Sequence, residues 1–299
     1  MIGYPSLDHL RIFASVAETG SFSAAAKRLN RAQSVISYAV ATLEEQLGGI
    51  PLFNRSTHRP TLTAAGQALL TDAREIVLAV ETMRAKARGI GAGLEPEVVI
   101  AVDVMLPSAI LTEALNALRA AYPGIGLRLF VEALGAIADR VLSGQCAIGI
   151  TGPLPDPPDL LELSVIGSVE LVPVAAPSHP LAQIKDSITQ KLLRGHVQLV
   201  LTDRSPFTAG RDFAVASLET WRLGDLGAKH DLLLAGLGWG NMPRPMIADD
   251  LSAGRLVILP IEDGSTHRYP LSSIARSDTP PGPVARWLVN QIADRLRGR

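Results

Sequence analysis

Four polar residues near the start of one amphipathic segment have types and spacing suited to nucleic-acid chemistry. The segment extends from Gln33 to Leu47, and Gln33, Ser34, Ser37 and Tyr38 lie on its polar face. A glutamine amide can form two hydrogen bonds with adenine in the major groove, and serine hydroxyls can bind bases or phosphates. We therefore expect this face to contact DNA, with ordinary helix surface as the alternative for Gln33, Ser37 and Tyr38.

A basic turn follows this segment. Residues 51–53 and 60–62 are predicted to form two short strands, and the polar tip between them carries Arg55, His58 and Arg59. Such a tip can contact the DNA backbone or enter the minor groove, whereas the alternative for Arg55 is a structural role within the hairpin. The predicted DNA-binding residues are Lys27, Arg31, Gln33, Ser34, Ser37, Tyr38, Arg55, His58 and Arg59.

Two further helices must hold this face in place. Apolar residues recur at helical spacing over residues 7–17, and Gly20 ends that first helix. Ser23 is expected to cap a second helix, whose small alanines allow two helices to approach closely. The pattern predicts a helix-turn-helix followed by a wing.

Across this region the sequence resembles the LysR-type transcriptional regulators. The strings LRIF and ETGSFSAAAKRL within residues 10–29 are similar to the family's opening helices, QSVIS and LEEQLG within 33–48 to its recognition helix, and LFNR and LTAAG within 52–66 to its wing and exit. The resemblance implies a winged helix-turn-helix that binds double-stranded operator DNA. Three features depart from the family pattern: Ala32 replaces a serine, Ser34 replaces a proline, and Gly48-Gly49-Ile50 is one residue longer than usual.

A long amphipathic helix follows, and Thr63 is placed to cap it. Its apolar residues alternate steps of four and three, the spacing of a coiled-coil seam, whereas its other faces are charged. Pairing with a second chain is favoured over packing within one chain, and the resemblance implies dimers that assemble into a homotetramer. Gly89, Gly91 and Gly93 are expected to end the helix and form a flexible joint. The predicted dimerisation residues are Leu69, Ala73, Ile76, Val80, Met83 and Ala87, with Ile90 continuing the seam.

Over residues 98–150, apolar strand-like and helix-like segments alternate, which predicts a parallel sheet, and a second α/β unit begins near residue 169. Segments within 175–182 and 235–243 also resemble the second lobe of the LysR-type effector domain. The expected fold class is thus α/β with an N-terminal all-α winged helix-turn-helix and a two-lobed, periplasmic-binding-protein-like effector domain. The expected domains are residues 1–63 for DNA binding, 64–94 for the linker helix and glycine hinge, 95–166 with 269–299 for lobe I, and 167–268 for lobe II.

Strand ends and helix starts in such a fold line the crevice where ligands bind. Helix N-termini there favour anionic ligands, but Asp103, Glu132 and Asp203 oppose them, so the charge of the effector stays open. The alternative for each candidate is a loop or core role, and Trp239 can equally be a core ring. The predicted effector-binding residues are Asp103, Val104, Met105, Glu132, Thr151, Thr202, Asp203, Trp239 and Asn241.

Composition narrows the remaining function classes. Residues 1–94 carry ten Lys and Arg against seven Asp and Glu, although the whole chain has a net charge of −1, which fits a basic head on an acidic body. The single cysteine, Cys146, lies in an apolar run and is expected to be buried rather than reactive. The sequence has no dinucleotide fingerprint, phosphate loop, nucleophile elbow or metal-spaced histidine pair, so we expect no enzyme activity, no cofactor and no metal.

The partners follow from these observations. No apolar run approaches the length of a membrane span, and no signal-peptide pattern is found, so we expect a cytoplasmic protein without membrane contact. The expected partners are operator DNA, a small-molecule effector, further copies of the same chain and RNA polymerase. A transport-type solute receptor shares the two-lobed architecture but not the DNA-binding head, and sequence-specific DNA binding would separate the two classes.

Overall fold

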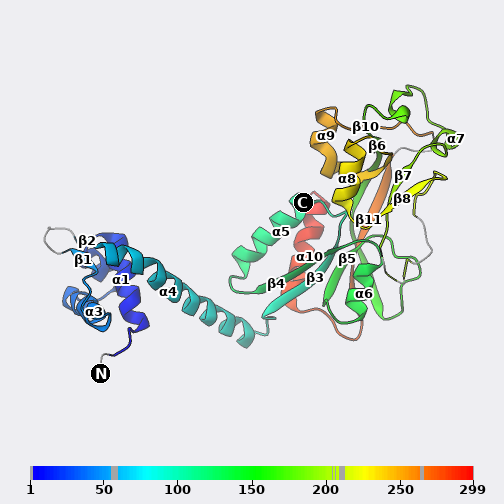
Figure 1. Ribbon diagram of the computed structural model, residues 1–299. Helices are drawn as coiled ribbons and strands as arrows, with labels where there is room; N and C mark the ends of the chain where they lie inside the picture. The colour runs from blue at the N-terminus through cyan, green and yellow to red at the C-terminus, as the bar shows by residue number, and fades with distance from the viewer. Residues whose placement is uncertain are drawn as a thin grey trace. The chain divides into compact units, whose positions relative to one another are not determined.

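The computed structural model describes residues 3–54, 60–203, 205, 207–208, 213–262 and 266–298. They belong to two compact units, Met1–Arg88 and Gly89–Arg299 (Figure 1). Each unit has its own apolar core. The described part of the chain has no helix that is long and apolar enough to span a membrane. The same residues contain no group of three or more His, Cys, Asp or Glu that could hold a metal ion.

The first unit is built on three short helices: α1 (Leu7–Thr19), α2 (Phe22–Leu29) and α3 (Gln33–Gln46). Gly20 ends α1 in the left-handed conformation at φ 62°, as predicted. The predicted cap of α2 is wrong by two residues. Ser21, not Ser23, has the extended backbone of an N-cap, and its hydroxyl accepts a hydrogen bond from the Ala24 N–H at 3.3 Å.

The wing packs onto the core of this unit. Strands β1 (Phe53–Asn54) and β2 (Thr61–Leu62) pair antiparallel, which confirms the two predicted strands. The Phe53 ring meets Phe13 and Phe22 edge-on, at centroid distances of 5.6 and 5.7 Å, and so anchors the hairpin base. The buried core consists of Ile12, Phe13, Val16, Ala25, Ala26, Ile36, Ala39, Val40, Leu43, Leu52, Phe53, Leu70 and Ala73.

The long helix α4 (Ala64–Gly91) begins where predicted. The Thr63 hydroxyl accepts a hydrogen bond from its first turn at 2.9 Å. Its end differs from the prediction, because Gly89 and Gly91 lie inside the helix and only Gly93, at φ 75°, takes the left-handed conformation beyond it. A side chain at that position would strain the backbone, so Gly93 marks the helix end.

A mixed sheet of seven strands organises the second unit. Its strands are β3 (Glu97–Asp103), β4 (Gly126–Glu132), β5 (Ile148–Thr151), β6 (Leu161–Ala175), β9 (Gly240–Pro243), β10 (Val257–Ile258) and β11 (His267–Arg276). β3 pairs in parallel with β4 and β5, as predicted. β11 runs antiparallel to both β5 and β6, which makes the sheet mixed, and the sequence pattern indicated no direction for this strand. Local apolar patterns specify strands but not the direction in which a distant strand returns.

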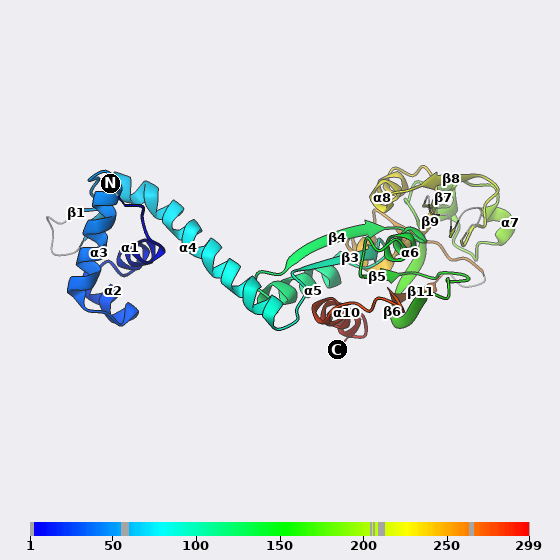
Figure 2. The ribbon, with the colours of Figure 1, turned by 90° about the horizontal axis from the view of Figure 1, so that it is seen from below.

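Alternating side chains along β3 place helices on both faces of the sheet, forming lobe I. Val98 and Ile100 pack with two of the helices, whereas Ala101 packs with the third on the other face. The helices are α5 (Ser108–Ala121) and α10 (Pro283–Leu296) on the first face and α6 (Ala136–Leu142) on the second. Figure 2 shows α5 and α10 side by side. The predicted helices over 108–121 and 283–296 are confirmed.

The C-terminal half of β6 supports lobe II, where β9 and β10 pair with it. A parallel pair, β7 (Gln198–Leu201) and β8 (Thr220–Leu223), joins this layer through a bridge between Gln198 and Trp239. The described helical segments of lobe II are η1 (Pro180–Gln183), α7 (Gln190–Leu193), α8 (Leu226–Leu234), η2 (Arg244–Ile247) and α9 (Ala248–Ser252).

The antiparallel pair of β6 and β11 connects the two lobes, with a bulge between Leu271 and Ser272. Sequence patterns predicted β11 but missed the first half of β6, residues 161–168. Because both strands pass from one lobe to the other, a small change in their twist would alter the angle between the lobes.

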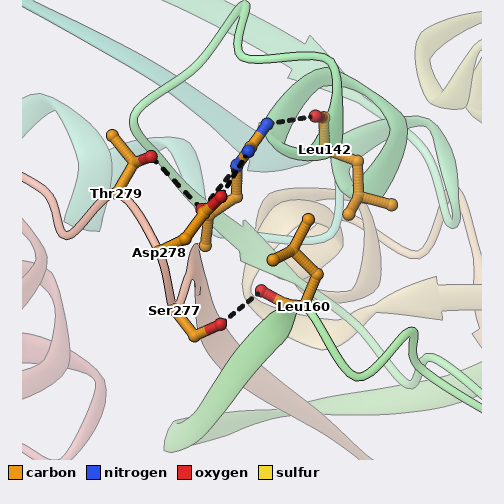
Figure 3. Close-up of polar contacts among 6 residues, drawn as sticks. Leu142, Leu160, Ser277, Asp278 and Thr279 are labelled. Carbon is orange, nitrogen blue, oxygen red and sulfur yellow. Dashed lines mark hydrogen bonds and ion pairs between the residues drawn. The ribbon is translucent and has the colours of Figure 1, made fainter.

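Polar contacts fasten the lobe I end of β11. The Arg276 guanidinium donates to the Leu142 carbonyl at 2.9 Å, at the end of α6, and forms an ion pair with Asp278 at 2.7 Å. Figure 3 shows this end of the strand, where the Ser277 hydroxyl donates to the Leu160 carbonyl at 3.3 Å. The start of β6, the end of α6 and the end of β11 are therefore held together.

Candidate nucleic-acid interface and effector site

One side of α3 packs in the core of the first unit, and the other carries most of its predicted DNA-binding residues. Tyr38 is 74% exposed, and Gln33 and Ser34 are exposed in the first turn. Ser37 is half-buried at the edge of this surface. Val35 is 46% exposed in the same turn. It was not predicted as a contact, because an apolar residue in an amphipathic helix is normally assigned to the core. The exposed surface combines hydrogen-bonding and apolar groups, which suits base edges in a major groove.

The departure at Ala32 has a structural consequence. Ala32 is the N-cap of α3 and gives the helix no side-chain hydrogen bond. The first amide groups of a helix have no partner within it, and without a capping side chain they are free to bind another acceptor. Such amides, at the positive end of the helix dipole, are good donors to a phosphate oxygen.

The basic residues divide into three groups. Lys27 is exposed at the end of α2. Arg31 is exposed but forms an ion pair with Asp8 at 2.6 Å, and this hydrogen bond raises the pKa of Arg31. The pair ties the start of α1 to the turn before α3, so Arg31 has a positioning contact besides its charge. The predicted wing residues Arg55, His58 and Arg59 lie outside the described residues.

The predicted dimerisation seam on α4 changes character along its length. Ala73 is 3% exposed and Leu69 is half-buried, because both pack against the core of their own unit. These two positions are therefore occupied within one chain. Farther along, Ile76, Met83 and Ile90 are 48, 62 and 59% exposed, and Ala87 is exposed as well, whereas Val80 is half-buried. The free part of the seam begins at Ile76.

A cavity of about 670 Å³ lies between lobe I and lobe II, and we call it the polar chamber. It brings together three predicted effector-binding residues, Glu132, Thr202 and Asp203. Arg222, on the lobe II side of the chamber, was not predicted. A single charged residue in a short strand does not indicate from sequence that its side chain lines a cavity. The chamber is lined by Glu132, Ala133, Ala136 and Asp139 from lobe I and by Thr202, Asp203, Ser205, Arg222, Gly224 and Asp225 from lobe II.

Three of the four acids of the polar chamber are held by donors of the protein itself. Glu132 forms an ion pair with Arg140 at 2.5 Å. Asp203 accepts a hydrogen bond from the Ala136 N–H at 2.9 Å, and Asp225 caps α8 by accepting from the Ala228 N–H at 2.6 Å. These contacts compensate the negative charges, so the acids alone do not make the chamber a cation site.

A second cavity, of about 290 Å³, adjoins the polar chamber, and we call it the apolar chamber. Val104 lines it and donates its N–H to the carbonyl of Glu132 at 2.8 Å, so one hydrogen-bonded pair borders both chambers. The predicted residue Val104 is thus at the cleft. Besides Val104, the lining consists of Ser108, Leu226, Gly227, His230, Met242 and Met246.

Asp103 lies beneath the cleft and lines neither chamber. Its carboxylate is 1% exposed and accepts hydrogen bonds from the Met105 N–H, the Gly152 N–H and the Tyr269 hydroxyl at 2.8, 2.9 and 2.9 Å. Burial raises the pKa of Asp103 to about 6, although the three hydrogen bonds lower it. The carboxylate therefore connects the ends of β3 and β5 to the crossing strand β11.

The other predicted pocket residues are also buried or lie elsewhere. Met105 and Thr151 are 6 and 1% exposed, and the Thr151 hydroxyl has no hydrogen-bond partner within the described structure. Trp239 is 2% exposed and its Nε1–H donates to the Ser217 hydroxyl at 3.0 Å, as a core ring does. Trp239 and Asn241 line a separate cavity of about 160 Å³ that shares no lining residue with the two chambers.

One buried charge went unpredicted. Lys229 is 3% exposed, and its ammonium donates to the Asn241 carbonyl at 2.7 Å. Burial lowers the pKa of Lys229 to about 8. Nothing in the sequence marks this lysine, because its position on the inner face of α8 depends on how that helix packs.

A winged helix-turn-helix joined to a two-lobed fold with an interlobe cavity defines a transcriptional regulator that senses a small molecule. Residues 7–67 match the family model for the bacterial regulatory helix-turn-helix protein, lysR family, and residues 91–297 match that for the LysR substrate binding domain. The chain belongs to the LysR family of transcriptional regulators. The resemblance, the fold class and the expected function are thereby confirmed.

Individual relatives agree with this assignment. The chain is 32% identical to the uncharacterized HTH-type transcriptional regulator YeeY of Escherichia coli (strain K12), over 85% of this chain and 82% of that protein. It is 33% identical to the HTH-type transcriptional activator AllS of Salmonella typhimurium, over 83% of this chain and 81% of that protein. The structure of CrgA, a LysR-type regulator from Neisseria meningitidis, shares the fold at 22% identity with a TM-score of 0.52, covering 97% of this chain and 98% of that one.

Proposed function

We propose that this regulator binds a small metabolite between its lobes and that the metabolite changes how the DNA-binding head engages its operator. The observation that carries the proposal is the polar chamber of about 670 Å³, whose walls come from both lobes. A ligand that contacts both lobes favours one angle between them, and only such a difference in affinity can drive a switch. The adjoining apolar chamber favours a metabolite that carries polar groups at one end and an apolar portion at the other.

The test is a thermal-shift screen of the full-length protein against a metabolite library. We expect a compound that raises the melting temperature of the wild type and of the control variant Thr279→Ala, but raises it much less in Thr202→Ala. Thr202 lines the polar chamber, whereas Thr279 is exposed and lines neither chamber. A compound that stabilises all three proteins equally would place the effector site elsewhere.

In the head, α3 is the recognition helix of this proposal. Gln33, Ser34 and Tyr38 read base edges from its exposed side, Lys27 binds phosphate, and Ser37 and Arg31 contribute from the margins of the same surface. We further propose that Arg55, His58 and Arg59 of the wing contact the DNA backbone or the minor groove. A single head offers few base contacts, so useful affinity requires two heads on successive half-sites.

Assembly and domain boundaries complete the proposal. The exposed part of the α4 seam, from Ile76 to Ile90, pairs two chains, and the dimers associate into a homotetramer that works with RNA polymerase in the cytoplasm. The protein carries out no reaction of its own. We assign residues 1–63 to the DNA-binding domain, 64–94 to the linker helix, 95–166 with 269–299 to lobe I, and 167–268 to lobe II.

A further inference from the structure

A contact across the two lobes closes one wall of the polar chamber. Residues that follow β7 in lobe II meet the start of α6 in lobe I, where the Asp203 carboxylate accepts a hydrogen bond from the Ala136 N–H at 2.9 Å. The Thr208 hydroxyl donates to the other oxygen of Asp203. The Phe207 N–H donates to the Ser205 hydroxyl at 3.0 Å, so a local hydrogen bond positions Phe207.

Gly135 allows the two lobes to approach this closely. A Cβ on Gly135 would lie 2.6 Å from the Ser205 hydroxyl oxygen and 3.0 Å from the Phe207 Cβ, both of which belong to lobe II. The backbone of Gly135, at φ −71° and ψ −13°, is open to any residue. Glycine is therefore needed for the contact between the lobes and not for the local conformation.

Phe207 extends the contact into the core of lobe I. It packs against the apolar cluster that contains Ile137, Val141 and Ile274, on the face of the sheet that α6 covers. A lobe II side chain thus covers lobe I core, and opening the lobes would expose apolar surface on both partners.

The same residues form part of the chamber wall. Ala136 from lobe I and Asp203 and Ser205 from lobe II line the polar chamber, so the contact between them decides whether the chamber is closed on that side. If a ligand binds only the closed chamber, its apparent association constant is the intrinsic one multiplied by the fraction of molecules that are closed. Opening the lobes therefore weakens binding.

We propose that Asp203, Ser205 and Phe207, meeting Gly135 and Ala136, form an interlobe clasp that sets the closed arrangement of the lobes and thereby controls effector binding. The control of binding rests on the proposed effector site in the polar chamber. The closing of the lobes by the clasp does not, because every contact of the clasp is made by the protein alone.

Hydrogen exchange on the full-length protein without effector tests the clasp. The variant Gly135→Ala adds a methyl group where lobe II approaches, and Phe207→Ala removes the ring from lobe I. The matched control is Gly195→Ala, where an added Cβ meets only the Leu192 carbonyl oxygen at 3.7 Å. We expect roughly tenfold faster exchange, or more, for the amides at the start of α6 in the two test variants and no change there in the control.

The double variant separates a clasp from two unrelated packing defects. If the residues form one clasp, Gly135→Ala has little further effect once Phe207→Ala has opened it, so the double variant exchanges about as fast as the faster single variant. Fluorescence-detected unfolding verifies that each variant is folded. If Gly135→Ala does not fold, a double-mutant cycle of Phe207→Ala and Asp203→Asn replaces that of Gly135→Ala and Phe207→Ala.

Two results would overturn the clasp. One is exchange in Gly135→Ala and Phe207→Ala no faster than in Gly195→Ala, and the other is full additivity of the two effects. A failed metabolite screen would weaken the proposed function but leave this result unaffected, because no effector is present in the exchange experiment.

Discussion

The buried carboxylate of Asp103 should give the effector domain an unusual dependence of stability on pH. Asp103 has no cationic partner among the described residues, and burial raises its pKa from 3.8 to about 6. Between these values the folded protein keeps a proton that the unfolded chain has released, so the free energy of unfolding falls as pH rises through this window. At about 1.4 kcal/mol for each tenfold change in acid dissociation constant, the loss is about 3 kcal/mol.

The variant Asp103→Asn isolates this contribution. It removes the titration but keeps the size of the side chain, at the cost of turning an amide donor toward backbone N–H groups. The unfolding free energy of the wild type minus that of the variant should therefore be largest below the unfolded pKa of 3.8 and decrease as pH rises, by about 2 kcal/mol between about pH 4 and pH 7. Other titrating groups are common to both proteins and cancel in the difference.

Urea unfolding followed by tryptophan fluorescence measures this difference in the full-length protein. Trp221, Trp239 and Trp287 all belong to the second unit, so the signal reports the effector domain and not the head. In Tyr269→Phe, Asp103 loses one donor, so its pKa should rise further and the window should extend to higher pH. A wild-type minus Asp103→Asn difference that stays flat between about pH 4 and 7 would refute the buried, raised-pKa carboxylate.

Lys27→Ala should weaken binding to operator and random DNA alike and lower the slope of log affinity against log salt by about 1, as measured by fluorescence anisotropy; an unchanged slope would remove Lys27 from the phosphate contacts. Val80→Asp should reduce the size of the assembly measured by sedimentation velocity, because a carboxylate would be buried in the seam. The control Ala85→Asp, roughly 140° around the helix from Val80, should leave the assembly unchanged. Equal sedimentation of the two variants would contradict the seam. Gly152→Ala would place a Cβ 1.8 Å from the Tyr269 hydroxyl oxygen and should lower the unfolding free energy by about 2–4 kcal/mol in urea titrations, so a neutral effect would contradict this packing.

Local patterns predicted the elements that depend on local chemistry. The apolar spacing over 108–121 and 283–296 predicted α5 and α10, because each helix buries one continuous stripe. The cap at Thr63 and the left-handed Gly20 were predictable because both arise from backbone needs within a few residues. The choice of Ser23 over Ser21 was wrong, since both serines suit a cap and only packing decides between them.

Features that depend on distant partners were not predictable. The first half of β6 carries exposed Leu163 and Val165, so it lacks the apolar pattern of a buried strand and forms by pairing with β11. Asp103 and Glu132 looked alike as acids at the ends of strands. Their roles differ because Asp103 turns beneath the cleft, toward Tyr269, whereas Glu132 reaches its wall. Ala73 fitted the seam spacing, but the core of its own unit covers it.

Base reading by α3 is tested most directly by selecting binding sites from random DNA with the full-length wild type and with Gln33→Ala. The wild type should enrich two similar half-sites about one helical turn, or a multiple of it, apart. Gln33→Ala should relax the base preference at one position of each half-site, by about 1–3 kcal/mol, and preserve the preferences at the other positions. An identical motif for both proteins, or no enriched motif for the wild type, would contradict base reading by α3.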